Sequence, residues 1–440
     1  MKHTSRILTL LLCLLMLSSC SASSRLLIAA PDIPDVPQYP KQIGTGLRFS
    51  DEKAFDAWRD DVHARSEIPA HADAIAPFIT AGAVQILSGS KSENRLFSPV
   101  NLYITIAMLA ESTAGETRDE ILALLGCSDI DALRQYSRDL WNATYRNDGA
   151  VTRTLATSLW LNTSFPIRHE TAARLSQSYY ASVYWGKMGS PEMDAALQQW
   201  LNENTMGLLS QQIDELQLPP EGLLALASTV AFRARWDQEF SPAKSTSELF
   251  HIPAGDLSCT FMNARRDGLL YWGEHFQAVA LSFDQYAGAM WLILPDEGFT
   301  PDDLLQDEDC LSLIATGGCP NSRHMRINLS VPKFDVTSRL ELSDSLRELG
   351  LNRVFDAGSA DFTPLTDADL PIGLDRIQHD ARVMIDEEGC KAAAYTVMLL
   401  AGAAPPQELE ETDFVLDRPF LFTITGPEGL PLFVGVVNTP

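Results

Sequence analysis

Residues 389–400, near the C-terminus, form the segment that most constrains how this chain of 440 residues can fold. In a β-strand, successive side chains point to opposite faces of the sheet. One face of this segment would therefore carry only uncharged side chains, namely Cys390, Ala392, Ala394, Thr396, Met398 and Leu400. Lys391 and Tyr395 fall on the other face. Because a loop that stays in solvent needs no such separation, the pattern predicts a segment able to enter a β-sheet.

Several further motifs occur in a fixed order along the chain. They are Asn94–Asn101, Gly115–Ile121, Val230–Trp236, Leu292–Gly298, Val331–Phe334, Arg418–Phe420 and Phe433–Asn438. Each motif alone is weak, but together and in this order they are specific. With residues 385–404 they resemble the conserved motifs, the hinge and the reactive-centre loop of the serpin family. The resemblance covers most of the chain.

The resemblance implies an α+β fold, the serpin fold. It is a single domain with a large central antiparallel or mixed β-sheet, further sheets, about eight to nine helices and an exposed reactive-centre loop. The implied activity is suicide inhibition: a serine protease cleaves the loop, which then inserts into the central sheet and traps the acyl-enzyme. Such a protein is not an enzyme. The alternative is a non-inhibitory surface binding or decoy protein that is cleaved as a substrate.

The resemblance places a loop and hinge over residues 387–413. The hinge residues are Glu387, Glu388, Gly389, Cys390, Lys391, Ala392, Ala393, Ala394, Tyr395 and Thr396. Glycine supplies backbone freedom, and the alanines can enter a sheet without steric hindrance. Cys390 stands where the family usually has threonine, but it is similar in size. Non-inhibitory members typically carry a charged or bulky residue at the hinge positions that would face the interior of the sheet. None of those positions carries such a residue here, which favours an inhibitor.

The family spacing also locates the bond that the protease cleaves. Seventeen residues run from Glu387 to Ala403, which places the reactive bond between Ala403 and Ala404. Cleavage at Leu400–Ala401 would suit a chymotrypsin-like protease but would leave a shorter strand. Because no Lys or Arg lies between residues 391 and 418, a trypsin-like target is disfavoured. An elastase-like protease with small-residue specificity is expected.

Five residues are expected to form a cluster where the central sheet opens. Ser98 and Pro99 match a family motif, and His379 matches the family's buried histidine. Asn101 stands where the family usually has serine, and Ser228 where it usually has asparagine. Because buried polar groups need partners, this exchange predicts a hydrogen-bonded Asn101–Ser228–His379 cluster, with independent drift as the alternative. His379 is expected to be structural and not a general base.

Residues 1–19 resemble the signal peptide of a bacterial lipoprotein. Two positively charged residues precede an apolar run, residues 7–17, that is too short to span a membrane. The small residues before Cys20 resemble a lipobox, in which that cysteine is lipidated. The alternative is an ordinary signal peptide cleaved near Ala22. Export and a lipid anchor at the bacterial cell envelope or surface are therefore expected, or secretion if Cys20 is not lipidated.

Residues 20–69 are expected to carry the lipid and to act as a tether. Proline recurs at every third position, at Pro31, Pro34, Pro37 and Pro40, which favours an extended spacer. An amphipathic piece, residues 55–62, either docks on the domain or frays. The serpin domain is expected to span residues 70–440, because no linker or internal repeat divides it.

Local patterns predict several elements of this domain. The helical spacing of apolar residues predicts one helix with Pro77 in its first turn and a second helix over residues 102–110. Thr117 and Glu120 have the spacing of a capping box for a third helix. Residues 289–294 are predicted to form a strand.

Composition and charge limit the partners. With 45% hydrophobic residues the chain can bury a large core. A formal net charge of −25 argues against nucleic acid and anionic membrane surfaces as partners and favours a basic protein. Membrane contact is expected only through the N-terminal lipid, and the protein is expected to be a monomer. The acidic run Gln407–Asp413 is either simply solvated or attracts a basic protease.

The remaining motifs point away from catalysis. The chain has no G-x-S-x-G, H-E-x-x-H, C-x-x-C or phosphate-loop motif, so no catalytic residue, metal or cofactor is expected. The cysteines after residue 20 are Cys127, Cys259, Cys310, Cys319 and Cys390, so at least one thiol is unpaired. Cys310 and Cys319 could form a small disulfide loop. Cys390 is either sensitive to oxidation or simply a small hydrophobic residue.

Overall fold

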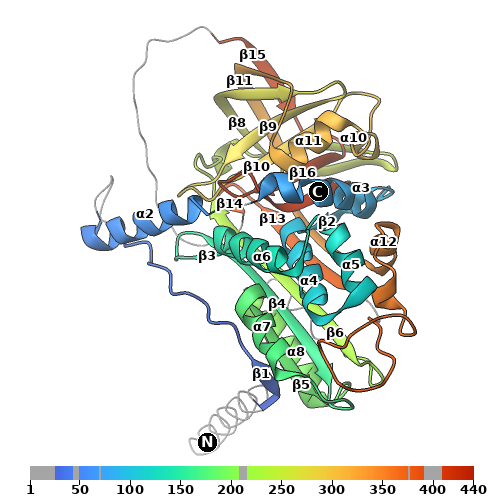
Figure 1. The fold of residues 1–440 in the computed structure, drawn as a ribbon. Coiled ribbons are helices and arrows are strands. Elements are labelled where there is room, and N and C mark those ends of the chain that lie inside the picture. The colour runs from blue at the N-terminus through green and yellow to red at the C-terminus, as the bar shows by residue number, and fades with distance from the viewer. Residues whose placement is uncertain (1–24, 43–48, 69–70, 208–215, 375–376, 391–408) are drawn as a thin grey trace, which may run out of the picture.

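The computed structural model describes residues 25–42, 49–68, 71–207, 216–374, 377–390 and 409–440. They form an α+β fold built on two β-sheets (Figure 1). No helix in these ranges is long and apolar enough to cross a membrane. The predicted signal peptide, Cys20, hinge residues 391–396 and the Ala403–Ala404 bond lie outside them.

The first sheet has eight strands within the described ranges and is called the eight-stranded sheet below. Its strands lie in the order β1 (Leu27–Ala29), β5 (Ala181–Gly186), β4 (Thr152–Asn162), β6 (Leu224–Arg235), β14 (Gly389–Cys390), β13 (Gln378–Ile385) and β12 (Phe334–Glu341), with β3 (Arg146–Asn147) paired to β4. The β4–β5 pair is parallel and the other pairs are antiparallel, so the sheet is mixed, as predicted.

The second sheet, the nine-stranded sheet, joins strands from the middle and the end of the chain, again counted over the described ranges. Its strands lie in the order β15 (Glu411–Val415), β11 (Asn321–Pro332), β8 (Gly255–Trp272), β9 (Phe276–Ser282), β10 (Ala289–Pro295), β16 (Phe420–Thr425), β17 (Pro431–Val437) and β2 (Arg95–Phe97), with β7 (Thr246–Ile252) paired to β8. Strand β10 confirms the predicted strand at residues 289–294.

Ten helices accompany the sheets in the described part of the chain, and eight of them have at least seven residues, as the predicted fold requires. They are α2 (Glu52–Ser66), α3 (Ala72–Leu87), α4 (Pro99–Ser112), α5 (Gly115–Leu124), α6 (Ile130–Thr144), α7 (His169–Tyr179), α8 (Pro191–Asn204), α10 (Pro301–Leu304), α11 (Glu308–Thr316) and α12 (Ser343–Glu348). Two 3₁₀ turns add Pro242–Lys244 and Arg353–Phe355.

Helices cover both faces of the eight-stranded sheet, and strand β4 shows why. Leu159 and Leu161 pack in the main core with residues of α3 to α7, whereas Trp160 between them packs in a separate cluster with Met193 and Leu197 of α8. This is the alternation that a strand imposes on its side chains. Helix α4 therefore lies under the sheet, and α8 lies across its other face.

A third apolar cluster joins the two sheets. Phe232, Ala234 and Cys390 of the eight-stranded sheet pack with Phe420 and Phe422 of the nine-stranded sheet. All five side chains are at most 6% exposed. The hinge residue Cys390 is thus part of the core that holds the sheets together.

Two local predictions about helix ends are wrong. Helix α3 begins at Ala72, so Pro77 lies inside the helix and not in its first turn. Proline removes only its own N–H, and the buried Ile75 and Phe78 on either side keep the helix packed. The second wrong prediction concerns α5. Thr117 lies inside this helix and forms no capping box.

Thr117 and Glu120 bind a distant loop instead of their own helix end. The Thr117 hydroxyl accepts from the Asp361 backbone N–H at 3.0 Å. The Glu120 carboxylate accepts from the backbone N–H groups of Asn352 and Arg353 at 3.0 and 2.9 Å. A capping-box spacing in the sequence cannot distinguish these tertiary contacts from a local cap.

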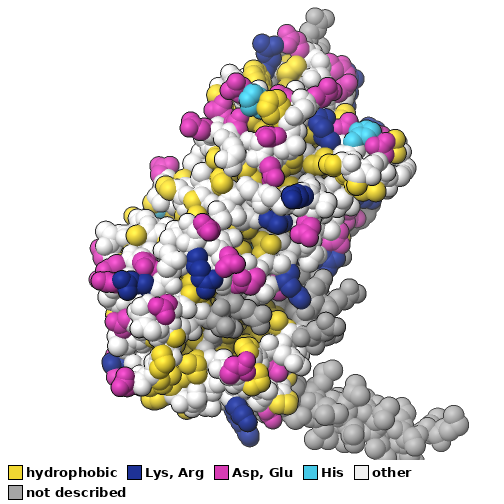
Figure 2. Space-filling view, turned by 90° about the vertical axis from the view of Figure 1, so that its right-hand side faces the viewer, with side chains coloured by type: hydrophobic (Ala, Val, Ile, Leu, Met, Phe, Trp, Pro, Cys, Tyr) yellow, Lys and Arg dark blue, Asp and Glu magenta, His cyan; other side chains and the backbone are white. Residues whose placement is uncertain are grey.

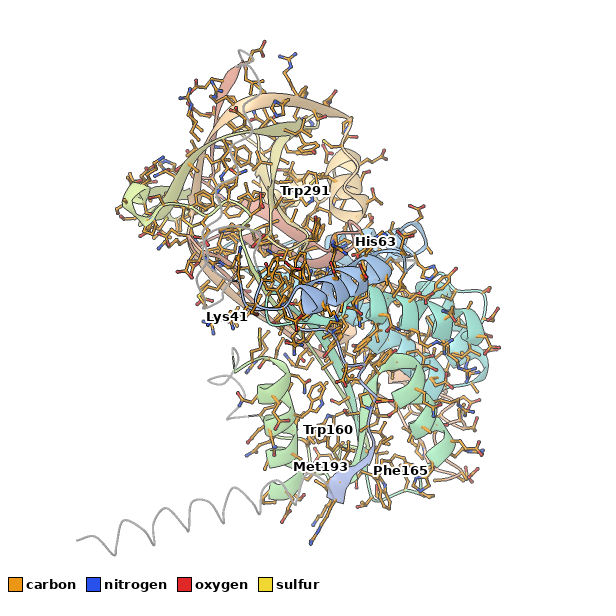
Figure 3. The ribbon with its side chains drawn as sticks, turned by 90° about the vertical axis from the view of Figure 1, so that its left-hand side faces the viewer. Lys41, His63, Trp160, Phe165, Met193 and Trp291 are labelled. Atoms are coloured by element: carbon orange, nitrogen blue, oxygen red, sulfur yellow. The ribbon has the colours of Figure 1, made fainter. Side chains whose placement is uncertain are left out.

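The N-terminal segment, predicted to be an extended tether, lies against the domain where the structure describes it. Residues 25–42 and 49–66, here called the N-terminal arm, pack along the domain (Figures 1 and 3). Leu27 pairs with Tyr184, which adds β1 to the edge of the eight-stranded sheet. Figure 3 shows the arm passing from β1, close to Trp160 and Met193, to α2 on the flank of the domain. Periodic proline predicts an extended backbone but not whether a sheet edge receives it.

The arm is fixed most firmly at Trp58, which is 2% exposed. Its indole N–H donates to Asp148 at 2.6 Å, and Arg146 lies over its ring. Phe55 stacks on the same indole, and Tyr39 packs against it edge to face. Of the two alternatives for residues 55–62, docking on the domain is therefore correct.

Candidate functional site: the hinge and the sheet opening

The hinge begins in a tight turn between β13 and β14. The Asp386 carboxylate accepts from the backbone N–H groups of Glu388 and Gly389, at 2.9 and 3.2 Å. The Asp386 backbone N–H donates to the Gly389 carbonyl at 3.0 Å. An aspartate that binds the backbone two and three residues ahead is a common way to close a turn. The turn reverses the chain and directs β14 back along β13.

Strand β14 lies between β13 and β6 and pairs with both. Cys390 is opposite Ile385 of β13 and Ala234 of β6, and its side chain is 3% exposed in the core. Burial raises the pKa of the Cys390 thiol to about 12. At neutral pH the thiol is therefore protonated, which disfavours a role in oxidation.

Gly389 fits only because it lacks a side chain. A Cβ atom on this residue would lie 2.3 Å from the carbonyl oxygen of Ala234 and 2.7 Å from the Cα of Arg235. Both atoms belong to the backbone of β6 and cannot move aside separately. The close approach of β14 to β6 therefore depends on glycine.

Glu387 anchors the turn to the rest of the domain. Its carboxylate accepts from the Ser245 hydroxyl at 2.7 Å and pairs with the Lys333 ammonium at 2.6 Å. Burial alone would raise the pKa of Glu387, but these two partners outweigh it and hold the pKa below its ordinary value. The carboxylate is thus ionised and bound at neutral pH.

Backbone contacts from the end of β6 complete this anchor. The indole N–H of Trp236 donates to the Asp386 carbonyl at 2.9 Å, and its backbone N–H donates to the Glu388 carbonyl at 3.0 Å. The Phe240 N–H donates to the Glu387 carbonyl at 3.0 Å. Three successive hinge carbonyls are therefore held.

A cavity lies on the α8 side of the sheet, beside the gap between β6 and β13. In the part of the chain that the structure describes, β6 and β13 are joined only through β14 and form no ladder with each other. A cavity of about 100 Å³ lies here. It is lined by Leu224 to Ser228 of β6, Gln378 and Asp380 of β13, and residues of α8 including Leu197. The sheet is thus loosely closed at the place where a further strand would fit.

Ser98 and His379 meet at the start of α4, as the predicted cluster requires. Ser98 caps the helix, its hydroxyl accepting from the Asn101 backbone N–H at 3.4 Å, and Pro99 occupies the first turn. The Ser98 backbone N–H donates to His379 Nε2 at 3.0 Å. His379 Nε2 therefore acts as an acceptor, and Nδ1 carries the proton.

The predicted hydrogen bonds of Asn101 are not formed. Both amide atoms of Asn101 and Nδ1 of His379 are buried without a hydrogen-bond partner among the described residues. His379 instead uses its acceptor on the backbone of Ser98, because the first N–H groups of a helix have no partner inside it. Ser228 is 5% exposed and belongs to the neighbouring strand β6. The prediction of an Asn101–Ser228–His379 network is wrong for Asn101.

Within the described part of the acidic run, Glu410 and Glu411 form ion pairs and remain about half exposed or more, as the solvated alternative expects. Strand β15 runs parallel to β11. Glu410 pairs with Arg323 and Glu411 with Arg265, each at 2.6 Å. Asn328 donates to Asp413 at 2.8 Å. The charges of Glu410 and Glu411 are thus matched locally.

The structure adds residues that the sequence analysis did not assign to the hinge. Lys333 and Trp236 lie in motifs that the analysis singled out, but their contacts with Glu387 and Asp386 could not be inferred from spacing. Ser245 carries no sequence signal. The five thiols after residue 20 are free, including Cys310 and Cys319, so the suggested disulfide is not formed. Over the described ranges no group of three or more His, Cys, Asp or Glu side chains could hold a metal ion.

The comparisons with known proteins agree with this geometry. The family model described as serpin, serine protease inhibitor, matches residues 79–440. Among curated proteins, Serpin-ZX of Arabidopsis thaliana is 25% identical over 373 residues, covering 81% of this chain and 94% of the relative. Serpin-Z1C of Triticum aestivum is 25% identical over 366 residues, covering 80% of this chain and 91% of the relative.

Solved structures show the same fold. The native state of tengpin, a thermophilic serpin, has a TM-score of 0.73 at 22% identity and covers 91% of this chain and 97% of its own. The native stressed conformation of AtSerpin1 from Arabidopsis has a TM-score of 0.72 at 23% identity, covering 86% of this chain and 98% of its own. Thyroxine-binding globulin in complex with thyroxine has a TM-score of 0.66 at 19% identity, with 84% and 99% covered.

Replacing Gly389 tests the close approach of β14 to β6. In Gly389→Ala the new Cβ would overlap the Ala234 carbonyl, so we expect β14 to separate from β6 and the unfolding free energy to fall by about 1–3 kcal/mol. Denaturant unfolding and proteolysis of residues 386–390 measure both effects. Gly268→Ala on β8 is the matched control, because its Cβ would have no atom within 4 Å. Equal stability of the two variants would contradict the prediction.

Burial of His379 predicts a pH dependence of stability. Desolvation lowers its pKa to about 4, below the ordinary 6.5. Between these values the unfolded chain takes up a proton that the folded chain does not, so stability falls as pH drops from 6.5 to 4, by about 3 kcal/mol. The unfolding free energy of the wild type and of His379→Gln is measured by denaturant unfolding at several pH values. It should change less steeply with pH in the variant. A ring titration of His379 near pH 6.5 in the folded protein would contradict this.

Proposed function

Since the chain belongs to the serpin family, we propose that it inhibits serine proteases by inserting its cleaved reactive loop between β6 and β13. The observation that carries the proposal is the position of β14, in which Cys390 already pairs with both strands and Gly389 pairs with β6. The residues that follow Cys390 would extend a ladder that has begun.

The register of β14 supports insertion of the hinge. Continued along β6, it would place Ala392 and Ala394 on the face that holds Cys390. Their neighbours there include Phe232 and Ala381, which are 6% and 3% exposed. Side chains larger than alanine would have to displace this core. The small residues of the hinge are thus explained by the packing that would receive them.

The larger apolar residues would arrive on the face of the sheet that α4 covers. In the same register Met398 would be opposite Leu226 and Leu400 opposite Leu224, two leucines that pack in the main core with Leu159 and Leu161. Burying a Met or Leu side chain contributes about 1.5–3 kcal/mol. Insertion would therefore release free energy in two ways, by pairing backbone groups and by burying apolar side chains.

The polar atoms under the sheet would also gain a partner. Thr396 would stand between Ser228 and His379, on the same face as Cys390. Both amide atoms of Asn101 and Nδ1 of His379 are without partners there. A hydroxyl can donate and accept, so Thr396 would satisfy groups whose burial is unfavourable in the present state.

The chemistry of trapping follows from acyl transfer. The protease serine Oγ attacks the Ala403 carbonyl, the bond to Ala404 breaks, and the serine proton passes through the catalytic histidine to the new Ala404 amine. The product is an ester between the protease serine and Ala403. Insertion then carries the protease along the sheet, and distortion of its oxyanion hole prevents hydrolysis of the ester.

We further propose that the target is elastase-like, with small-residue specificity at Ala403. The support comes from the alanines and glycine around the bond and from the absence of Lys and Arg between residues 391 and 418. On the surface, basic and acidic side chains are interspersed over the face shown in Figure 2, so no large patch of one sign selects the protease there. The loop itself is therefore expected to set the specificity.

The fold alone does not exclude a binding role. Thyroxine-binding globulin has a similar fold and is solved with bound thyroxine. The hinge decides between inhibition and a role as a cleaved decoy, because only insertion requires small, uncharged residues at alternate positions. The following pair of variants tests that requirement.

We expect Ala394→Glu to convert the inhibitor into a substrate, because the carboxylate would enter the core beside Ala381. Ala393→Glu is the matched control, since it would lie opposite Arg382 on the other face and should still trap. Each variant is mixed with an elastase-type serine protease, and denaturing gels give the ratio of covalent complex to cleaved chain. Mass spectrometry of the released peptide should find Ala404 at its N-terminus. Equal trapping by both variants, or no covalent complex with the wild type, would contradict the proposal.

We also propose that the protein is exported and anchored by a lipid on Cys20. The support is the apolar run at residues 7–17 and the small residues before Cys20. Metabolic labelling with a fatty acid in a bacterial host should mark the wild type but not Cys20→Ser. An unlabelled wild type that is released into the medium would indicate an ordinary signal peptide.

A further inference from the structure

The N-terminal arm leaves the domain at one end of the eight-stranded sheet. Leu27 of β1 pairs with Tyr184 of β5, Tyr184 with Trp160 of β4, and Trp160 with Ala225 of β6. These four residues form one row across the sheet. Strand β14 lies at the opposite end of β6, at Arg235 and Ala234. Figure 1 shows β1 and β15 at opposite ends of the molecule.

A trapped protease would arrive at the end from which the arm leaves. With the register of β14 continued, Leu399 falls opposite Ala225, in the row of Leu27, and Ala403 lies four residues beyond. Four strand spacings separate β1 from the inserted strand, which is about 19 Å. A serine protease domain of about 230 residues has a radius of gyration of about 17 Å and a diameter of about 45 Å. A protease bound at Ala403 would therefore extend over the exit of the arm.

Anchoring of the N-terminus would bring a membrane to the same place. From Cys20 to Leu26 there are six residues, which span at most about 22 Å when fully extended. That length is about half the diameter of the protease. As long as β1 stays paired with β5, an anchored domain has too little room for a protease between this end and the membrane.

Strand β1 is a short attachment, in which Leu27 packs on the cluster of Trp160 and Ile28 packs on the main core. It has three residues, none of them fully buried, and its pairing with β5 is irregular between Leu27 and Ala29. The next contacts of the arm are the Gln38 side chain on the Asn147 carbonyl at 3.1 Å and the Tyr39 N–H on the Asp148 carbonyl at 2.8 Å. Because a proline-rich stretch lies between these two attachments, β1 can leave β5 while the contacts of Gln38 and Tyr39 remain.

Loss of β1 would move the point of attachment away from the protease. Asn147 pairs with Thr152 of β4, and eight residues of strand from Thr152 to Trp160 correspond to about 26 Å. The eighteen residues from Cys20 to Gln38 would reach about 55 Å at the rise of a polyproline helix. The domain could then rest on its flank and leave the protease free beside the membrane.

We propose that β1 is a releasable strand, which leaves β5 when an anchored molecule traps a protease, while the contacts at Gln38, Tyr39 and Trp58 hold the arm to the domain. This inference rests on the proposed inhibitory function and applies to any anchor at the N-terminus. The proline-rich stretch then serves as a spacer only in the trapped complex.

A disulfide between β1 and β5 tests the inference. Leu27→Cys with Tyr184→Cys joins two residues that are direct register partners, as a disulfide requires. A hexahistidine tag in place of residues 1–20 anchors the chain to phosphatidylcholine vesicles that contain a nickel-chelating lipid. An elastase-type serine protease is added, and gels give the ratio of cleaved chain to covalent complex, on vesicles and in solution, with the disulfide oxidised or reduced.

We expect the oxidised disulfide to raise the cleaved fraction several-fold on vesicles, reduction to restore trapping, and all forms to trap equally in solution. Deuterium exchange of the Leu27–Ala29 amides should accelerate in the vesicle-bound complex of the protein without the disulfide. Equal trapping by the oxidised form on vesicles and in solution, or unchanged exchange, would overturn the inference. Absence of a covalent complex in solution, even without the disulfide, would instead overturn the proposed function.

Discussion

The position of β14 between β6 and β13 is the constraint on which the rest of the site depends. It is held by the Asp386 turn, by the pairing of Glu387 with Lys333 and Ser245, and by the donors of Trp236 and Phe240. All these contacts lie at one end of the sheet. In the described structure, β6 and β13 are joined only through Gly389 and Cys390 of β14. The β6 and β13 strands are thus connected through β14 at the hinge and are not paired with each other along the rest of their length. Insertion of a further strand requires this arrangement.

The sequence predicted the fold well because it depends on patterns with a fixed physical meaning. The apolar spacing around Leu102 predicts a helix, and α4 is buried on all its sides. Of the alternation predicted along the hinge, only Cys390 lies within the described residues, and the rest stays a prediction. The N-terminal arm was not predicted, because the edge of β5 and the site around Asp148 exist only in the folded domain. The Asn101 prediction failed for a related reason. The exchange of two residue types does not reveal that a backbone N–H group donates to the histidine instead.

Charge is distributed differently from what the total of −25 implies. The acidic residues at the start of β15 are matched by arginines of β8 and β11, and Glu387 is matched by Lys333. The two exposed pairs, at Glu410 and Glu411, add little stability. Each ion pair uses one acidic and one basic group, so the net charge of −25 is unchanged and continues to favour a basic partner.

The last residues of the chain supply strands at the interior of the nine-stranded sheet. Strand β16 pairs with β10, and β17 pairs with β2 near residue 95. Asn438 also binds the Glu93 carbonyl at 2.6 Å. A chain still being synthesised lacks these strands, so β10 is without its neighbour β16 and β2 without β17, although every strand of the eight-stranded sheet has already been made. Because contacts so distant in sequence form slowly, the nine-stranded sheet would be completed last, once the end of the chain emerges.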